Sequence, residues 1–177
     1  ITFNSAPDYE TKSSYSIIVE VSDGTNTATT QTLTINVTDI NDNDPVISGL
    51  ASSISVAENQ TSVVTVSASD ADGDDLTYSL TGTDASSLSI NSSTGVITFN
   101  SAPDYETKTS YSVTVTVSDG TNTDTQAVTI SVTNVNDISP VISSSATFSA
   151  TENQNSVGTV SASDAEGDDL TYSLTGT

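Results

Sequence analysis

Hydrophobic and polar residues alternate along much of this chain. Within residues 15–21 the alternating apolar positions are Tyr15, Ile17, Val19 and Val21. Within residues 33–37 they are Leu33, Ile35 and Val37. A period of two is typical of strands that bury one face, and no segment shows the 3.6-residue period of a helix. The pattern therefore predicts an all-β protein.

The chain repeats itself with the period of one small domain. ITFNSAPDYETK occurs at residues 1–12 and returns 96 residues later at 97–108. SASDADGDDLTYSLTGT at 67–83 returns 94 residues later, with one substitution, at 161–177. Near-identity over such lengths indicates tandem duplication. We expect the last part of one unit, one complete unit and the first part of another, at residues 1–44, 45–139 and 140–177.

The complete unit is predicted to contain seven strands. They are expected near residues 53–57, 62–68, 76–81, 87–91, 96–100, 110–118 and 126–133. Gly, Asn, Asp and Ser separate them, as turns require, and SDGTNT at 118–123 carries the Asp-Gly signal of a hairpin. Seven short strands in about a hundred residues predict tandem immunoglobulin-like, seven-stranded Greek-key sandwiches.

The charge balance narrows the function. The chain has 2 Lys and Arg residues against 23 Asp and Glu residues, a formal net charge of −21, and no His. Nucleic acid and anionic membranes are poor partners, because both require Lys and Arg to neutralise phosphate. Such acidity indicates solvated charge, disorder or metal binding. The ordered alternation argues against disorder, and no apolar run is long enough for membrane insertion.

The same composition argues against an enzyme. Without His or Cys, the chain cannot build Ser-His-Asp, Cys-His or zinc-histidine sites, and it cannot form disulfides. A glycosidase that uses two carboxylates stays open on composition alone. Tyr78, Phe99 and Tyr111 share the alternating phase of buried residues, so they are predicted to lie in the core rather than to stack on sugars.

The acidic residues are predicted to gather between units. If consecutive strands run in opposite directions, the loops at the end of one unit, the linker and the loops at the start of the next unit meet at each junction. At the first junction these segments supply Asp8, Glu10, Asp39, Asn41, Asp42, Asn43, Asp70, Asp72 and Asp119. Oxygen ligands without nitrogen or sulfur fit a hard cation, and flexible sites of about six to eight oxygens favour Ca²⁺ over Mg²⁺.

Five short motifs carry a family resemblance. AEN at 57–59, DAD at 70–72, DYE at 104–106, SDG at 118–120 and the linker DINDNDP at 39–45 resemble the calcium motifs of cadherin repeats, particularly those of bacterial surface arrays. The resemblance covers the whole chain, and it implies three Ca²⁺ ions at a full junction. It implies as metal-site residues Asp8, Glu10, Asp39, Ile40, Asn41, Asp42, Asn43, Glu58, Asp70, Asp72, Asp104, Glu106, Asp119, Asn136, Asp137, Asp164 and Glu166.

The second linker, NVNDISP at 134–140, departs from the first. Asn134 replaces Asp39 and Ile138 replaces Asn43, while Glu166 in the following unit replaces the acid that corresponds to Asp72. Asn134 removes a full negative charge, and Glu has a longer reach than Asp. We therefore expect weaker or fewer ions at the second junction.

Calcium at the junctions has a mechanical consequence. Bound ions tie carboxylates on both sides of a linker together, whereas bare carboxylates repel one another. Extracellular calcium modules bind at about 10⁻⁴ to 10⁻³ M, which excludes the cytosol. We expect a calcium-rigidified spacer of a secreted or cell-surface adhesin or filament, most simply bacterial, in which copies of the repeat can associate with one another. A module that binds polysaccharide or a protein receptor is the alternative.

Overall fold

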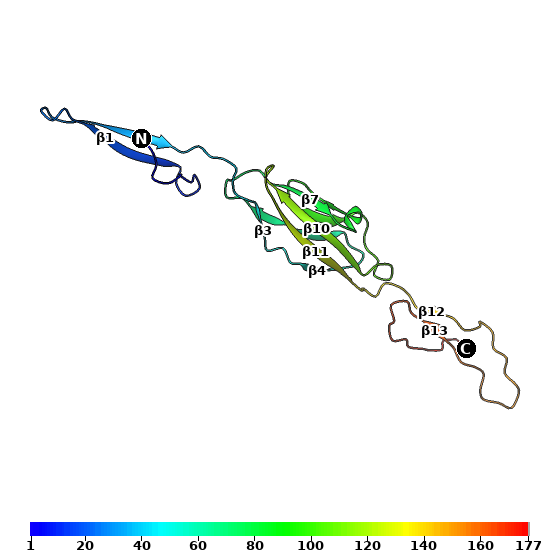
Figure 1. The fold of residues 1–177 in the computed structure, drawn as a ribbon. Coiled ribbons are helices and arrows are strands. Elements are labelled where there is room, and N and C mark those ends of the chain that lie inside the picture. Colours follow the sequence, from blue (N-terminus) through cyan, green and yellow to red (C-terminus); the bar gives the residue numbers. More distant parts are fainter. Residues whose placement is uncertain (177) are drawn as a thin grey trace.

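The computed structural model describes residues 1–176, which form strands and turns with one 3₁₀ turn, η1 (Ala85–Ser87). Figure 1 shows three parts that follow one another along an extended line: an N-terminal hairpin, a two-layered sandwich and a short C-terminal strand pair. The sandwich holds the folded core, and the acidic linkers lie between the parts.

The first layer of the sandwich is a four-stranded sheet in the order β4-β11-β10-β7. Its strands are β4 (Ser53–Ala57), β7 (Thr77–Thr81), β10 (Ser110–Ser118) and β11 (Thr123–Thr133). β4 runs parallel to β11, whereas β10 is antiparallel to both of its neighbours. These strand directions agree with the expectation that consecutive strands run in opposite directions and place successive loops at opposite ends of the unit.

The second layer consists of two smaller sheets, β3-β6 and β5-β9-β8. Its strands are β3 (Val46–Ser48), β5 (Ser62–Thr65), β6 (Ser67–Ser69), β8 (Leu88–Ile90) and β9 (Val96–Phe99). All of its pairings are antiparallel. The fold is thus an all-β sandwich of the expected class.

The core lies between the layers and follows the alternation in the sequence. Val113, Val115 and Val117 of β10 are at most 1% exposed, and Ile130 of β11 is fully buried. Phe99 of the facing layer is 3% exposed. Tyr78 and Tyr111 pack against this cluster, so the three aromatic residues expected in the core lie there or at its edge.

Two features of the strands differ from the expectation. The predicted second strand is divided at Val66, whose N–H donates to the Gly95 carbonyl (2.9 Å) instead of continuing a regular ladder. A further strand, β3, precedes the first predicted strand. The Ile47 N–H donates to Asp124 Oδ2 (2.8 Å), a side chain of β11 that is distant in sequence and therefore gives no local signal.

The partial units reproduce pairings of the complete unit. In the N-terminal hairpin, β1 (Ser14–Val21) pairs with β2 (Thr29–Asn36), and Tyr15 lies opposite Ile35 as Tyr111 lies opposite Ile130. The C-terminal pair, β12 (Val141–Ile142) with β13 (Ala162–Ser163), has the register of β3 with β6. Other identical segments differ in structure: TYSLT forms β7 at 77–81, where it pairs with β10, but forms no strand at 171–175.

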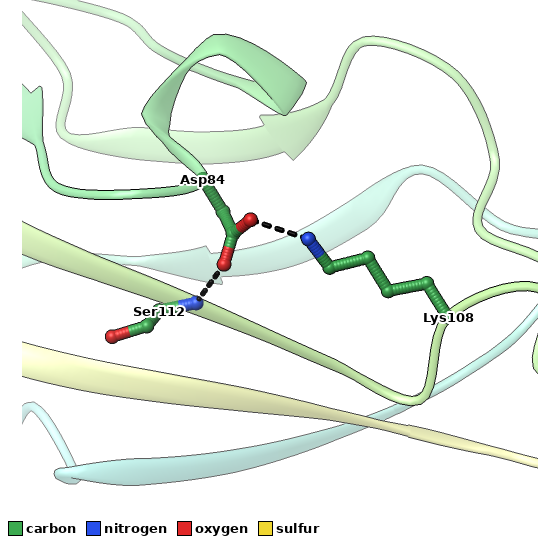
Figure 2. Close-up of polar contacts among 3 residues, drawn as sticks. All are labelled: Asp84, Lys108 and Ser112. Carbon is green, nitrogen blue, oxygen red and sulfur yellow. Dashed lines mark hydrogen bonds and ion pairs between the residues drawn. The ribbon is translucent and has the colours of Figure 1, made fainter.

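One ion pair closes the side of the sandwich. Figure 2 shows that the Lys108 ammonium group contacts one oxygen of Asp84, while the Ser112 N–H donates to the other (2.7 Å). Lys108 also lies over the Tyr111 ring, 4.6 Å from its centroid. The contacts fix the loop before η1 to β10. The pKa of Asp84 is lowered by the bond from Lys108 and then by the bond from Ser112.

Candidate metal centres

Within residues 1–176, the structure brings acidic side chains together in four groups. Within each group, one carboxylate oxygen from each residue lies within 4.8 Å of those of the others. The groups are Glu10–Asp39–Asp72, Asp70–Asp72–Asp74, Glu58–Glu106–Asp137 and Asp164–Glu166–Asp168. All four lie at the linkers or in the loops that face them. With two Lys and Arg residues in the whole chain, their charge has little local compensation.

The first group joins three separate segments. Glu10 belongs to the turn before β1, Asp39 to the linker, and Asp72 to the loop between β6 and β7. Asp72 is held against the linker, because its Oδ2 accepts the N–H groups of Asp42 (3.1 Å) and Asn43 (2.8 Å). A cation here would contact a carboxylate from each unit and one from the linker.

Two aspartates at the start of the complete unit have oxygens without a partner. Asp70 Oδ2 and Asp119 Oδ2 are buried and accept no hydrogen bond among the described residues. Their other oxygens are used: Asp70 Oδ1 accepts the Asp72 N–H, and Asp119 Oδ1 accepts those of Thr121 and Asn122. Buried polar atoms normally have a partner. The orphaned carboxylate oxygens and the all-oxygen donor set both fit Ca²⁺.

Asp119 lies in the turn between β10 and β11, which is shorter than expected because β11 begins at Thr123. Residues 119–122 connect β10 to β11, and the Asn122 amide reaches the linker, where Nδ2 donates to Asn41 Oδ1 (3.2 Å) and to the Asn43 carbonyl (3.1 Å). The turn therefore joins the two strands of the hairpin and also holds the linker in place through Asn122. Asn122 was not among the expected residues, since Asn in a turn has an ordinary local explanation.

At the second junction, Glu58 anchors the linker. It is only 4% exposed, and its two oxygens accept the N–H groups of Tyr105 and Val135, each at 2.8 Å. Glu106 and the linker residue Asp137 complete its group. The amide of Asn59, which has a positive φ of 65°, donates to Asp137.

Glu166 takes the structural place of Asp72. Its carboxylate accepts the N–H groups of Asp137 (3.0 Å) and Ile138 (2.8 Å), which are the linker positions that correspond to Asp42 and Asn43. The longer side chain therefore reaches the same backbone groups.

Several expected residues have other contacts. Asp8 accepts the N–H and hydroxyl of Thr11, and Asp104 accepts those of Thr107, so both carboxylates stabilise local turns and neither lies in an acidic group. Ile40 is 66% exposed in the linker. The Asp42 carboxylate accepts from the Asn43 amide (3.1 Å), and the Asn136 amide donates to Asp168.

Asp74 and its repeat counterpart Asp168 were not expected in the groups. Each lies two residues after Asp72 or Glu166 and faces the same loop centre, which the glycines at 73 and 167 permit with φ of 81° and 80°. The sequence signal was the third acid of the DADGD and DAEGD strings.

The pKa shifts report crowding of negative charge. The pKa of Asp74 is raised by desolvation and then by the charges of Asp70 and Asp72. The pKa of Glu106 is raised by desolvation and by the charges of Glu58 and Glu166. Desolvation and neighbouring negative charge therefore disfavour the ionised forms of Asp74 and Glu106, whereas the pKa of Asp72 is lowered, chiefly by the hydrogen bond from the Asn43 N–H.

Comparisons with known proteins agree with this architecture. The family model of the cadherin domain matches residues 52–133. Human Protocadherin Fat 1 is 37% identical over 109 residues, which are 56% of this chain and 2% of that protein. The crystal structure of mouse cadherin-23 EC22-24 matches with a TM-score of 0.67 and 27% identity, over 92% of this chain and 57% of that one.

The structure of the protocadherin gammaB7 EC3-6 cis-dimer matches with a TM-score of 0.67 and 29% identity, over 78% of this chain and 36% of that one. This chain thus spans a small part of the human relative and between about a third and somewhat over half of the solved structures.

The fold and the matches define tandem cadherin-type repeats, with the cadherin domain itself matched over residues 52–133. Cadherin domains are non-enzymatic adhesion modules of extracellular and cell-surface proteins, and the family binds Ca²⁺ between repeats. The relatives with a named organism are human and mouse proteins, so the bacterial affiliation has no support. Among the described residues, no helix is long and apolar enough to cross a bilayer.

Proposed function

We propose that this chain is a calcium-rigidified spacer within an extracellular adhesion protein. The observation that carries the proposal is the Glu10–Asp39–Asp72 group, in which carboxylates of one unit, the linker and the next unit lie within 4.8 Å of one another. Without a cation these groups repel, and with one they are tied to a common charge. The linker then changes from a loose joint to a stiff one.

The ligands are proposed from both ends of each junction. At the first, Glu10, Asp39, Asp70, Asp72 and Asp119 supply carboxylates, and Asp8, Ile40, Asn41, Asp42 and Asn43 complete the set. At the second, they are Glu58, Asp104, Glu106, Asn136, Asp137, Asp164 and Glu166. Bound Ca²⁺ supplies only positive charge and coordination. The chain positions the oxygens through the backbone bonds to Asp72, Glu166 and Glu58.

The unit boundaries follow from the same arrangement. Units are proposed at 1–44, 45–139 and 140–177, with each linker ending just before a proline. Pro45 is fully buried, which anchors the start of the complete unit.

Contact between copies of the repeat is a second, compatible role. One matched structure is that of a protocadherin cis-dimer, and the matched family consists of adhesion modules. Polysaccharide binding has less support, because Phe99 is buried and Tyr78 and Tyr111 pack against the core rather than forming a stacking surface.

Calcium titration of the chain by calorimetry tests the proposal. We expect binding in the range of about 10⁻⁴ to 10⁻³ M, a loss of affinity in Asp72→Asn, and no loss in Asp75→Asn, which removes an equal charge outside the four groups. Equal titration of both variants and wild type, or no heat of binding at all, would contradict it.

A further inference from the structure

The two linkers differ in charge at two positions, Asp39 against Asn134 and Asp44 against Ser139, and of these two aspartates only Asp39 lies in an acidic group. Asp39 of the first linker lies in an acidic group, whereas its counterpart Asn134 carries no charge. We infer that the second junction binds Ca²⁺ more weakly than the first and is the hinge of the array, with the residue at 39 and 134 determining the difference. The inference rests on the proposed function and states how calcium affinity differs between the two junctions.

The first argument is which units contribute carboxylates to the acidic groups at each junction. At the first junction, Glu10 of one unit and Asp72 of the next share a group with Asp39. At the second junction, the charge of Glu166 is one of the causes that raise the pKa of Glu106. Among the described residues, however, no acidic group there contains carboxylates from both units. A single cation therefore has fewer charged ligands with which to bridge the second joint.

The second argument is the demand for a cation at the first junction. Asp70 Oδ2 is buried there and has no hydrogen-bond partner among the described residues. A bound cation would compensate this oxygen, which has no other partner.

The substitution at 166 does not account for the difference. Glu166 keeps the two linker bonds that Asp72 makes, with 2.8 Å to Ile138 N–H against 2.8 Å to Asn43 N–H. It also keeps a place in an acidic group with its neighbours. Ile138 lacks the side-chain amide with which Asn43 donates to Asp72 Oδ1 (2.7 Å) and Asp42 Oδ1 (3.1 Å), but this change removes no charge. The missing carboxylate at 134 is the change that removes a charge from an acidic group, and ligand charge sets the calcium affinity of a site.

Reciprocal substitutions test the inference in the full chain. Amide NMR signals of Asp42 and Asn43 report the first linker, and those of Asp137 and Ile138 report the second, during addition of CaCl₂. In wild type we expect the first pair to reach half-change at a Ca²⁺ concentration roughly tenfold or more below the second. Asp39→Asn should raise the first midpoint and Asn134→Asp should lower the second.

Ser139→Asp is the matched control, because it adds the same charge to the second linker at the position of Asp44, which lies in no acidic group. It should leave the second midpoint near wild type. Equal midpoints in wild type, or an Asn134→Asp variant that titrates no earlier than Ser139→Asp, would overturn the inference and leave calcium binding intact. An absence of any response at either linker would instead refute the proposed function together with the inference.

Discussion

Replacing Glu58 separates its structural role from its proposed role as a calcium ligand. Its buried carboxylate fastens the turn at Tyr105 and the linker at Val135 through two hydrogen bonds of 2.8 Å. Glu58→Ala removes both acceptors and leaves two N–H groups without a partner. Glu58→Gln keeps one acceptor oxygen and turns an amide toward the other N–H.

A hydrogen bond to a charged acceptor contributes about 1.5 to 3 kcal/mol. Repulsion from Glu106 and Asp137, which share its group, offsets part of the two bonds when Ca²⁺ is absent. We therefore expect Glu58→Ala to cost about 3 kcal/mol in chelator, which lowers the Tm of a domain of roughly 100 residues by about 15 °C. The Glu58→Gln variant should lose about half as much.

Calcium adds a second difference. A cation present at about 100 times its Kd stabilises the folded wild type by about 2.7 kcal/mol, and both variants should gain less, because they lack one ligand charge. Thermal unfolding followed by circular dichroism, in chelator and in millimolar CaCl₂, measures both effects. If Glu58→Ala lowers Tm equally in the two conditions, Glu58 is only a structural anchor; if it lowers Tm in neither, the hydrogen-bond reasoning fails.

Three further predictions concern the sandwich itself. Asp84→Asn should lower Tm by on the order of 5 °C at pH 7. Because the pKa of Asp84 is lowered in the folded state, the stabilisation is present above the unfolded pKa of 3.8 and is lost as pH falls through the folded pKa. A loss of Tm in the variant that is as large at pH 2 as at pH 7 would contradict this prediction. Phe99→Ala, in the core, should cost about 3 to 5 kcal/mol in denaturant unfolding, equally with and without Ca²⁺, and a calcium-dependent cost would show that the core and the junctions are coupled. Gly95→Ala should destabilise the fold by more than about 1 kcal/mol in the same assay, since φ is 68° and an added Cβ would lie 2.6 Å from the Val66 carbonyl oxygen; a neutral result would show that the turn relaxes freely.

The strands were predictable because alternation and burial coincide. Tyr111, Val113, Val115 and Val117 follow a period of two in the sequence, and the same residues face the core. β3 was not predictable from its own three residues. It pairs with β6, and the Ile47 N–H also donates to Asp124 of β11, which lies 77 residues further along the chain.

The places where carboxylates gather were predictable, whereas the members of each acidic group were less so. The repeated acidic motifs indicated where carboxylates gather, since antiparallel strands bring their loops to the two ends of a unit. Asp8 and Asp104 could not be distinguished by sequence from their neighbours Glu10 and Glu106, yet their shorter side chains bond to the turn that contains them. A cation that binds Asp8 or Asp104 must compete with the hydrogen bonds from Thr11 and Thr107.

Small-angle X-ray scattering of the chain in millimolar CaCl₂ and in excess chelator tests the central claim most directly, with MgCl₂ as the comparison cation. The proposed function predicts a longer maximum dimension and a stiffer profile in calcium than in chelator, with a smaller change in magnesium. Identical profiles in calcium and chelator would contradict it, because the carboxylates at Glu10, Asp39 and Asp72 would then lie together without tying the units to a common ion.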